Sequence, residues 1–153
     1  MHDIGNCINR NNHAQSGAIM AFRILDKLGM SDQDIATIIS AIGNHDESDG
    51  TPVNPTAAAL ILADKTDVRR SRVRYPQTRS FNIHDKVNYA VKESKVVLDK
   101  EEKTIALYLT LDTSITPVMD YFEIFLGRMS MCKKAAKSLK LYFRLNINGL
   151  ELM

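Results

Sequence analysis

The chain has 153 residues and a formal net charge of +2; 44% of its residues are hydrophobic and 25% are charged. The length predicts one domain, or one domain with an appended subdomain, and the hydrophobic content is ample for a core. No apolar run approaches the roughly 18–20 residues of a membrane span, no signal peptide precedes the first motif, and Cys7 and Cys132 lack the C-x-x-C spacing of a cysteine zinc site. We therefore expect a cytoplasmic protein without a membrane partner.

The first third of the chain predicts short helices separated by polar loops. Gly5 is typical of a helix end, so residues 1–4 are expected to form the last turn of a helix. Asn12 is expected to cap a helix over residues 13–28 whose apolar stripe contains Ala18, Phe22 and Leu25. Gly29 should end that helix.

Two more helices are expected before residue 75. Ser31, with Asp34 three residues later, resembles a capping box and predicts a helix that ends near His45. Asn54 followed by Pro55 predicts a third helix, from residue 55 to about residue 72, with Asp64 in its apolar middle.

Beyond this helical part we expect a linker and a small second subdomain. Residues 75–85 have no hydrophobic period and predict a linker. Apolar residues then alternate over 87–91 and again over 105–111, with a charged hairpin loop over 99–103, and Thr116-Pro117 opens a helix to about residue 139. A last alternating stretch and the turn Asn148-Gly149 complete a ββαβ pattern over 86–153, in which one helix covers an antiparallel sheet. The fold class predicted is α+β.

The residues with the clearest chemical potential are histidines and carboxylates in the helical part. They are His2, Asp3, His13, His45 and Asp64. Neutral imidazoles and carboxylates select divalent ions such as Mn, Fe, Zn, Co or Mg. Asp64 lies in an apolar helical run, where a lone carboxylate costs several kcal/mol unless it is paired or bound to a metal ion.

Four short segments, in this order, resemble the HD-domain superfamily of metal-dependent phosphohydrolases. His2-Asp3-Ile4-Gly5 resembles the signature H-D-I-G, and the segment that starts at His13 resembles H-P-x-x-G-A. The segment that starts at Asn44-His45 resembles H-H-E-x-x-D-G, and Ala63-Asp64-Lys65-Thr66-Asp67 resembles A-D-x-x-D. The resemblance covers residues 1–74 and implies an all-α HD-type helical domain, which lacks the family's first helices and their histidine, followed by the linker and the ββαβ subdomain.

The resemblance also implies roles for individual residues. The metal-ligand candidates are His2, Asp3, His13, His45 and Asp64; Asp3 and Asp64 are the catalytic candidates, and Lys65 and Arg69 are candidates for binding substrate phosphate. The expected activity is hydrolysis of a nucleotide or other phosphate ester by water activated on one or two divalent metal ions.

The chain departs from the family pattern where Asn44 replaces a histidine and Ala14 replaces a proline. These departures favour an alternative, a catalytically impaired HD domain that serves as a ligand-binding or assembly module. The absent first helices would leave apolar faces exposed and favour a homodimer. Nucleic-acid binding through the arginines from Arg69 to Arg79 is a third and weaker hypothesis, which predicts a strong salt dependence of affinity.

Overall fold

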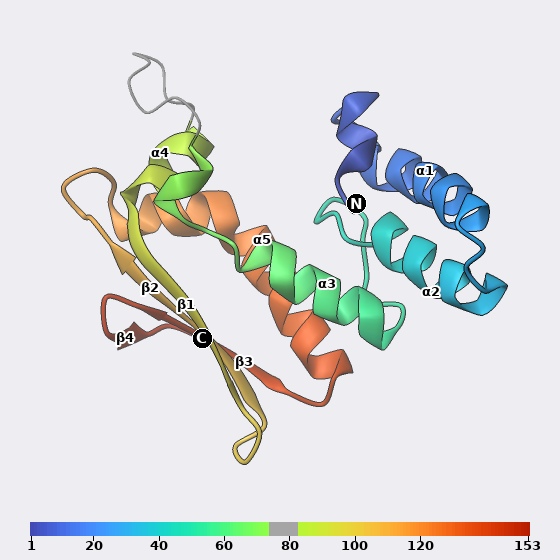
Figure 1. Ribbon diagram of the computed structural model, residues 1–153. Helices are drawn as coiled ribbons and strands as arrows, with labels where there is room; N and C mark the ends of the chain where they lie inside the picture. Colours follow the sequence, from blue (N-terminus) through green and yellow to red (C-terminus); the bar gives the residue numbers. More distant parts are fainter. Residues whose placement is uncertain (74–82) are drawn as a thin grey trace. The chain divides into compact units, whose positions relative to one another are not determined.

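The computed structural model describes residues 1–73 and 83–153, which form a mixed α+β protein (Figure 1). Close contacts divide the chain into two compact units, Met1–Asp64 and Lys65–Met153. The boundary lies ten residues before the end of the predicted helical domain at residue 74. Within the described residues, no helix is long and apolar enough to cross a membrane.

The first unit begins with a turn and a short 3-10 helix, η1 (Ile4–Cys7). The prediction of a final helical turn over residues 1–4 is therefore wrong, because the backbone bonds here join residues three apart and continue beyond Gly5. Gly5 is buried inside η1 instead of ending a helix. A Cβ atom at Gly5 would collide with the backbone oxygen of His13 and lie 2.6 Å from the backbone nitrogen of Gly17.

Helices α1 (His13–Lys27) and α2 (Asp32–Gly43) lie side by side in this unit (Figure 1). Both were predicted, and the Ser31 hydroxyl caps α2 by accepting a hydrogen bond from the backbone N–H of Asp34. Asn12 precedes α1 with a left-handed φ of 58°, and its side chain makes no capping bond, contrary to prediction.

The buried stripe of α1 differs from the predicted one. Its buried apolar positions are Ala14, Gly17, Ala21 and Leu25, whereas Phe22 is 49% exposed. The small residues match the close approach of η1, which the large Phe22 side chain would obstruct. Size therefore decides which face of this helix is buried.

Helix α3 (Pro55–Lys65) starts where predicted, since the Asn54 side chain accepts a hydrogen bond from the backbone N–H of Ala57. It ends at Lys65, and the chain continues to a short 3-10 helix, η2 (Arg70–Arg72), so the prediction of one helix to residue 72 is wrong. The β-branched residues Thr66 and Val68 follow α3, and both are buried. Such residues favour non-helical backbone.

The predicted linker over residues 75–85 lies mostly outside the described residues, and its last three positions belong to helix α4 (Ile83–Ala90). The strand expected over 87–91 is therefore largely wrong. Val87 and Ala90 are buried three residues apart, which matches a helix as well as Val87, Tyr89 and Val91 match a strand. Such a short alternation cannot separate the two.

The sheet has the order β1-β2-β3-β4, formed by β1 (Val91–Asp99), β2 (Thr104–Leu111), β3 (Tyr142–Ile147) and β4 (Leu150–Glu151). The β1–β2 pair is the predicted hairpin with the charged loop, and Asn148-Gly149 forms the predicted turn, with positive φ at both residues. However, β2 and β3 are parallel, so the prediction of an antiparallel sheet is wrong.

Helix α5 (Val118–Ser138) explains the parallel pairing. Its 21 residues span about 31 Å, enough to return the chain to the end of the sheet where β2 begins. The core of this unit lies between α5 and the sheet. It contains Phe125, Met129 and Cys132 from α5 and Leu107, Leu109, Leu145 and Ile147 from the strands.

Candidate metal centre

The five predicted metal-ligand residues come together at one end of the first unit. His2 and Asp3 lie in the turn before η1, His13 is the first residue of α1, His45 follows the end of α2, and Asp64 is the penultimate residue of α3. They form two groups of three, Asp3–His13–His45 and His2–His45–Asp64. In each group one ligand atom per residue lies within 4.8 Å of the others, and His45 belongs to both.

The first group places two imidazole nitrogens and one carboxylate oxygen face to face. The Nε2 atoms of His13 and His45 are 3.3 Å apart. Asp3 Oδ1 lies 3.3 Å from Nε2 of His13 and 3.5 Å from Nε2 of His45. Both histidines are buried, with 3% and 1% exposure, so water cannot separate these atoms freely.

Backbone carbonyls determine the proton positions on these two rings. His13 Nδ1 lies 3.0 Å from the carbonyl oxygen of Arg10, and His45 Nδ1 lies 2.6 Å from the carbonyl oxygen of Ile42. Because a carbonyl oxygen only accepts hydrogen bonds, each Nδ1 must carry the hydrogen. In a neutral ring Nε2 then carries only a lone pair. Two such lone pairs and the Asp3 carboxylate converge, an arrangement that requires a proton or a metal ion between them.

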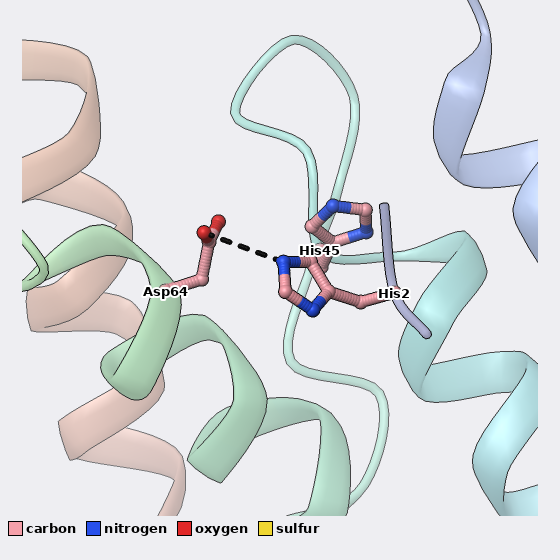
Figure 2. A group of neighbouring side chains, drawn as sticks. All are labelled: His2, His45 and Asp64. Atoms are coloured by element: carbon pink, nitrogen blue, oxygen red, sulfur yellow. Dashed lines mark ion pairs between the residues drawn. The ribbon is translucent and has the colours of Figure 1, made fainter. Parts of the chain in front are cut away.

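Figure 2 shows the second group, in which the His2 and His45 rings lie near the Asp64 side chain. His2 Nε2 is 3.6 Å from Asp64 Oδ1 and 3.5 Å from Asp3 Oδ2. The rings of His2 and His45 meet edge to face, with centroids 5.1 Å apart. Burial lowers the pKa of His2 and outweighs the opposing effect of the Asp3 and Asp64 carboxylates. His2 is therefore a neutral ligand candidate at neutral pH.

Two residues of the 44–50 segment behave differently from their neighbours in the sequence. Asn44, which occupies the position of a family histidine, donates its side-chain N–H to the carbonyl oxygen of Ser40 at the end of α2 and is not a member of either group. Asp46 places Oδ2 3.6 Å from His13 Nε2. We had considered Asp46 only as a loop residue that might orient His45. Its adjacency to His45 was the only sequence signal, and it did not indicate contact with His13.

The two candidate phosphate-binding residues belong to the second unit. Lys65 is the last residue of α3 and its side chain is only 4% exposed. Arg69 Nε forms an ion pair of 2.8 Å with Asp67 Oδ1. Among the described residues, neither is a member of the two ligand groups. The arginines at positions 74 and 79 lie outside the described residues.

The chemistry of these groups suits a divalent metal ion. The donors are imidazole nitrogens and carboxylate oxygens, which bind borderline and hard ions such as Zn, Mn, Fe, Co or Mg. The Nδ1 bonds to backbone carbonyls are the outer contacts that orient metal-binding histidines in known sites. The sequence matches no family model, no curated protein and no solved structure.

Proposed function

We propose that this chain is an HD-type, metal-dependent phosphohydrolase that cleaves a nucleotide or other phosphate ester. His2, Asp3, His13, His45 and Asp64 would hold one or two divalent ions. One observation carries the proposal: the Nε2 lone pairs of His13 and His45 lie 3.3 Å apart with the Asp3 carboxylate beside them. The order of these residues in the sequence matches the HD pattern and supports the assignment.

The residues of the chain perform distinct tasks in this proposal. A bound divalent ion supplies Lewis acidity and an activated water for attack on phosphorus. The Arg10 and Ile42 carbonyls keep the His13 and His45 rings in the ligand tautomer. Asp3 spans both groups through its two oxygens, and Asp64 lies beside His2, where a carboxylate can hold a proton during hydrolysis.

Metal content of the purified chain tests the proposal first. We expect at least one equivalent of Mn, Fe, Zn or Co by mass spectrometry, together with hydrolysis of p-nitrophenyl phosphate. Asp3→Asn should reduce metal affinity and activity at least about tenfold, because it removes the charge that faces both imidazoles. Asp3 is 46% exposed, so the variant should fold normally.

Matched variants separate ligand loss from general effects of substitution. Asp26→Asn changes an exposed carboxylate of α1 and should leave metal content unchanged. His45→Gln should remove metal from both groups, whereas His84→Gln, on α4 in the second unit, should not. A chain that stays free of metal after expression in metal-rich medium would contradict the proposal.

Asn44 supports a second candidate function, a catalytically impaired HD domain that binds a ligand or partner. Its amide is used at the end of α2, so the position contributes no ligand where the family has a histidine. This candidate predicts a chain that retains metal but does not hydrolyse phosphate esters. Asn44→His would then increase hydrolysis in the metal-loaded protein, measured as phosphate release.

A further inference from the structure

A polar pocket adjoins the candidate metal centre. It has a volume of about 310 Å³, at the small end of the range of roughly 300–1,000 Å³ typical of small-molecule sites. Two short stretches line it, residues 10–15 before and within α1 and residues 46–48 after His45. His13 belongs both to the pocket and to the first ligand group, and Asp46 lies 3.6 Å from it. A substrate held at the metal centre would therefore extend into this pocket.

The charges of the pocket indicate which part of the substrate enters it. Arg10 is the single cationic side chain among the described residues that line it, while Asp46 and Glu47 are anionic. Two carboxylates against one guanidinium disfavour a phosphate group, because like charges repel at short range. The phosphoryl group therefore belongs at the metal centre and the neutral remainder of the substrate in the pocket.

The lining also distinguishes among neutral groups. Each of the described lining residues is polar: Arg10, Asn11, Asn12, His13, Gln15, Asp46, Glu47 and Ser48. Asparagine and glutamine amides both donate and accept, and carboxylates accept from hydroxyls. A nucleobase, by contrast, is usually bound by stacking on an aromatic or apolar surface. His13 provides the only ring among these lining residues, and its two nitrogens already face Arg10 and His45.

We propose that this pocket binds a hydroxyl-rich leaving group, so that the substrate is a small sugar or polyol phosphate monoester rather than a nucleotide. The inference rests on the proposed phosphohydrolase function and narrows its substrate class. Ribose 5-phosphate and adenosine 5′-monophosphate are a matched pair, because they differ only in whether C1 carries a hydroxyl or adenine.

Binding is measured on the metal-loaded protein with the non-hydrolysable 5-phosphonate analogues of both compounds, by calorimetry. The ribose analogue should bind at least about tenfold more tightly than the adenosine analogue. Equal or tighter binding of the adenosine analogue would overturn the inference, and so would no binding of either at about 10 mM. The kcat/KM for phosphate release should favour ribose 5-phosphate over adenosine monophosphate by a similar factor.

Pocket variants test the assignment of residues. Glu47→Gln and Arg10→Gln should each raise KM for ribose 5-phosphate about tenfold and change kcat little, because one charged hydrogen bond to a hydroxyl is lost. Arg23→Gln, on the exposed face of α1, and Glu101→Gln, in the β1–β2 loop, are the controls and should leave KM unchanged. A pocket variant that behaves like its control would contradict the inference.

The two proposals fail in different ways. A chain without metal that hydrolyses no phosphate ester would remove the proposed function itself. A chain that holds metal and hydrolyses p-nitrophenyl phosphate, but prefers adenosine monophosphate to ribose 5-phosphate, would remove only the substrate class.

Discussion

At the scale of single residues, backbone carbonyls decide what the buried histidines can do. His13 and His45 are among the few buried polar side chains of the first unit, and a buried polar group without a partner costs about 1–3 kcal/mol. Each ring satisfies Nδ1 on a carbonyl oxygen and turns Nε2 toward the other ring. The result is a local concentration of electron pairs, which only a cation can stabilise.

Asp112 provides a residue-scale prediction in the second unit. A hydrogen bond from the Ser114 hydroxyl, followed by one from Lys92, lowers the pKa of Asp112 to about 2. Since this lies below the ordinary value of 3.8, the charged carboxylate stabilises the fold above pH 3.8, and the contribution is lost as the pH falls through 2.

NMR titration of the side-chain carboxyl carbons measures this pKa directly. In Ser114→Ala the pKa of Asp112 should rise toward its ordinary value, because the 2.6 Å hydrogen bond from the hydroxyl is removed. Asp26, on α1, is the reference carboxylate and should titrate identically in both proteins. An Asp112 signal that titrates near pH 4 in the unmodified chain would contradict the prediction.

At the scale of elements, the close approach of η1 to α1 positions His2 and Asp3. Gly5 and the first turns of α1 are in backbone contact, because neither Gly5 nor Gly17 has a side chain to separate them. The two residues before η1 therefore lie beside His13 at the start of α1. The glycine of the H-D-I-G segment thus serves packing and ligand placement together.

Gly5→Ala tests this packing. The added methyl group would overlap the His13 carbonyl oxygen, so the backbone must shift, and we expect a loss of about 1–3 kcal/mol in the free energy of unfolding. Metal affinity should fall as well, since His2 and Asp3 would move.

Gly127→Ala is the matched control for that substitution. Gly127 lies inside α5 with open space around it, so alanine should raise the free energy of unfolding by about 0.5–1 kcal/mol. Urea denaturation followed by circular dichroism measures both variants. Equal effects of the two substitutions would show that the η1–α1 contact is not tight.

At the scale of the whole molecule, the chain forms two compact units, and the complete ligand set belongs to one of them. His2, Asp3, His13, His45 and Asp64 all lie within Met1–Asp64, whereas the sheet and α5 belong to Lys65–Met153. A bound ion should therefore stabilise the units unequally. At a free metal concentration about 100-fold above Kd, the expected stabilisation is about 2.7 kcal/mol.

Hydrogen exchange with and without chelator measures this asymmetry. Removal of metal should increase amide exchange in α1 and α2 and leave exchange in β2, β3 and α5 unchanged. The Asp3→Asn protein is the control, because chelator should alter neither unit there. Equal changes in both units on addition of chelator would contradict a metal site confined to the first.

Much of the fold could be predicted because it depends on local signals. The Ser31 and Asn54 caps, the Asn148-Gly149 turn and the Thr116-Pro117 helix start act through neighbouring backbone groups. The failures have non-local or ambiguous causes. Residues 83–90 match two periods equally well, and the parallel pairing of β2 with β3 depends on the length of α5 and on sheet packing.

The sequence by itself determined which residues carry the candidate chemistry, since the identities and order of His2-Asp3, His13, His45 and Asp64 are written in it. Only the tertiary structure decided how they meet. It placed His45 in both ligand groups, set Asp46 beside His13 and turned Asn44 away to the end of α2. The physical reason is that ring orientation depends on the Arg10 and Ile42 carbonyls and on the Gly5–Gly17 approach, which arise only when separate segments pack together.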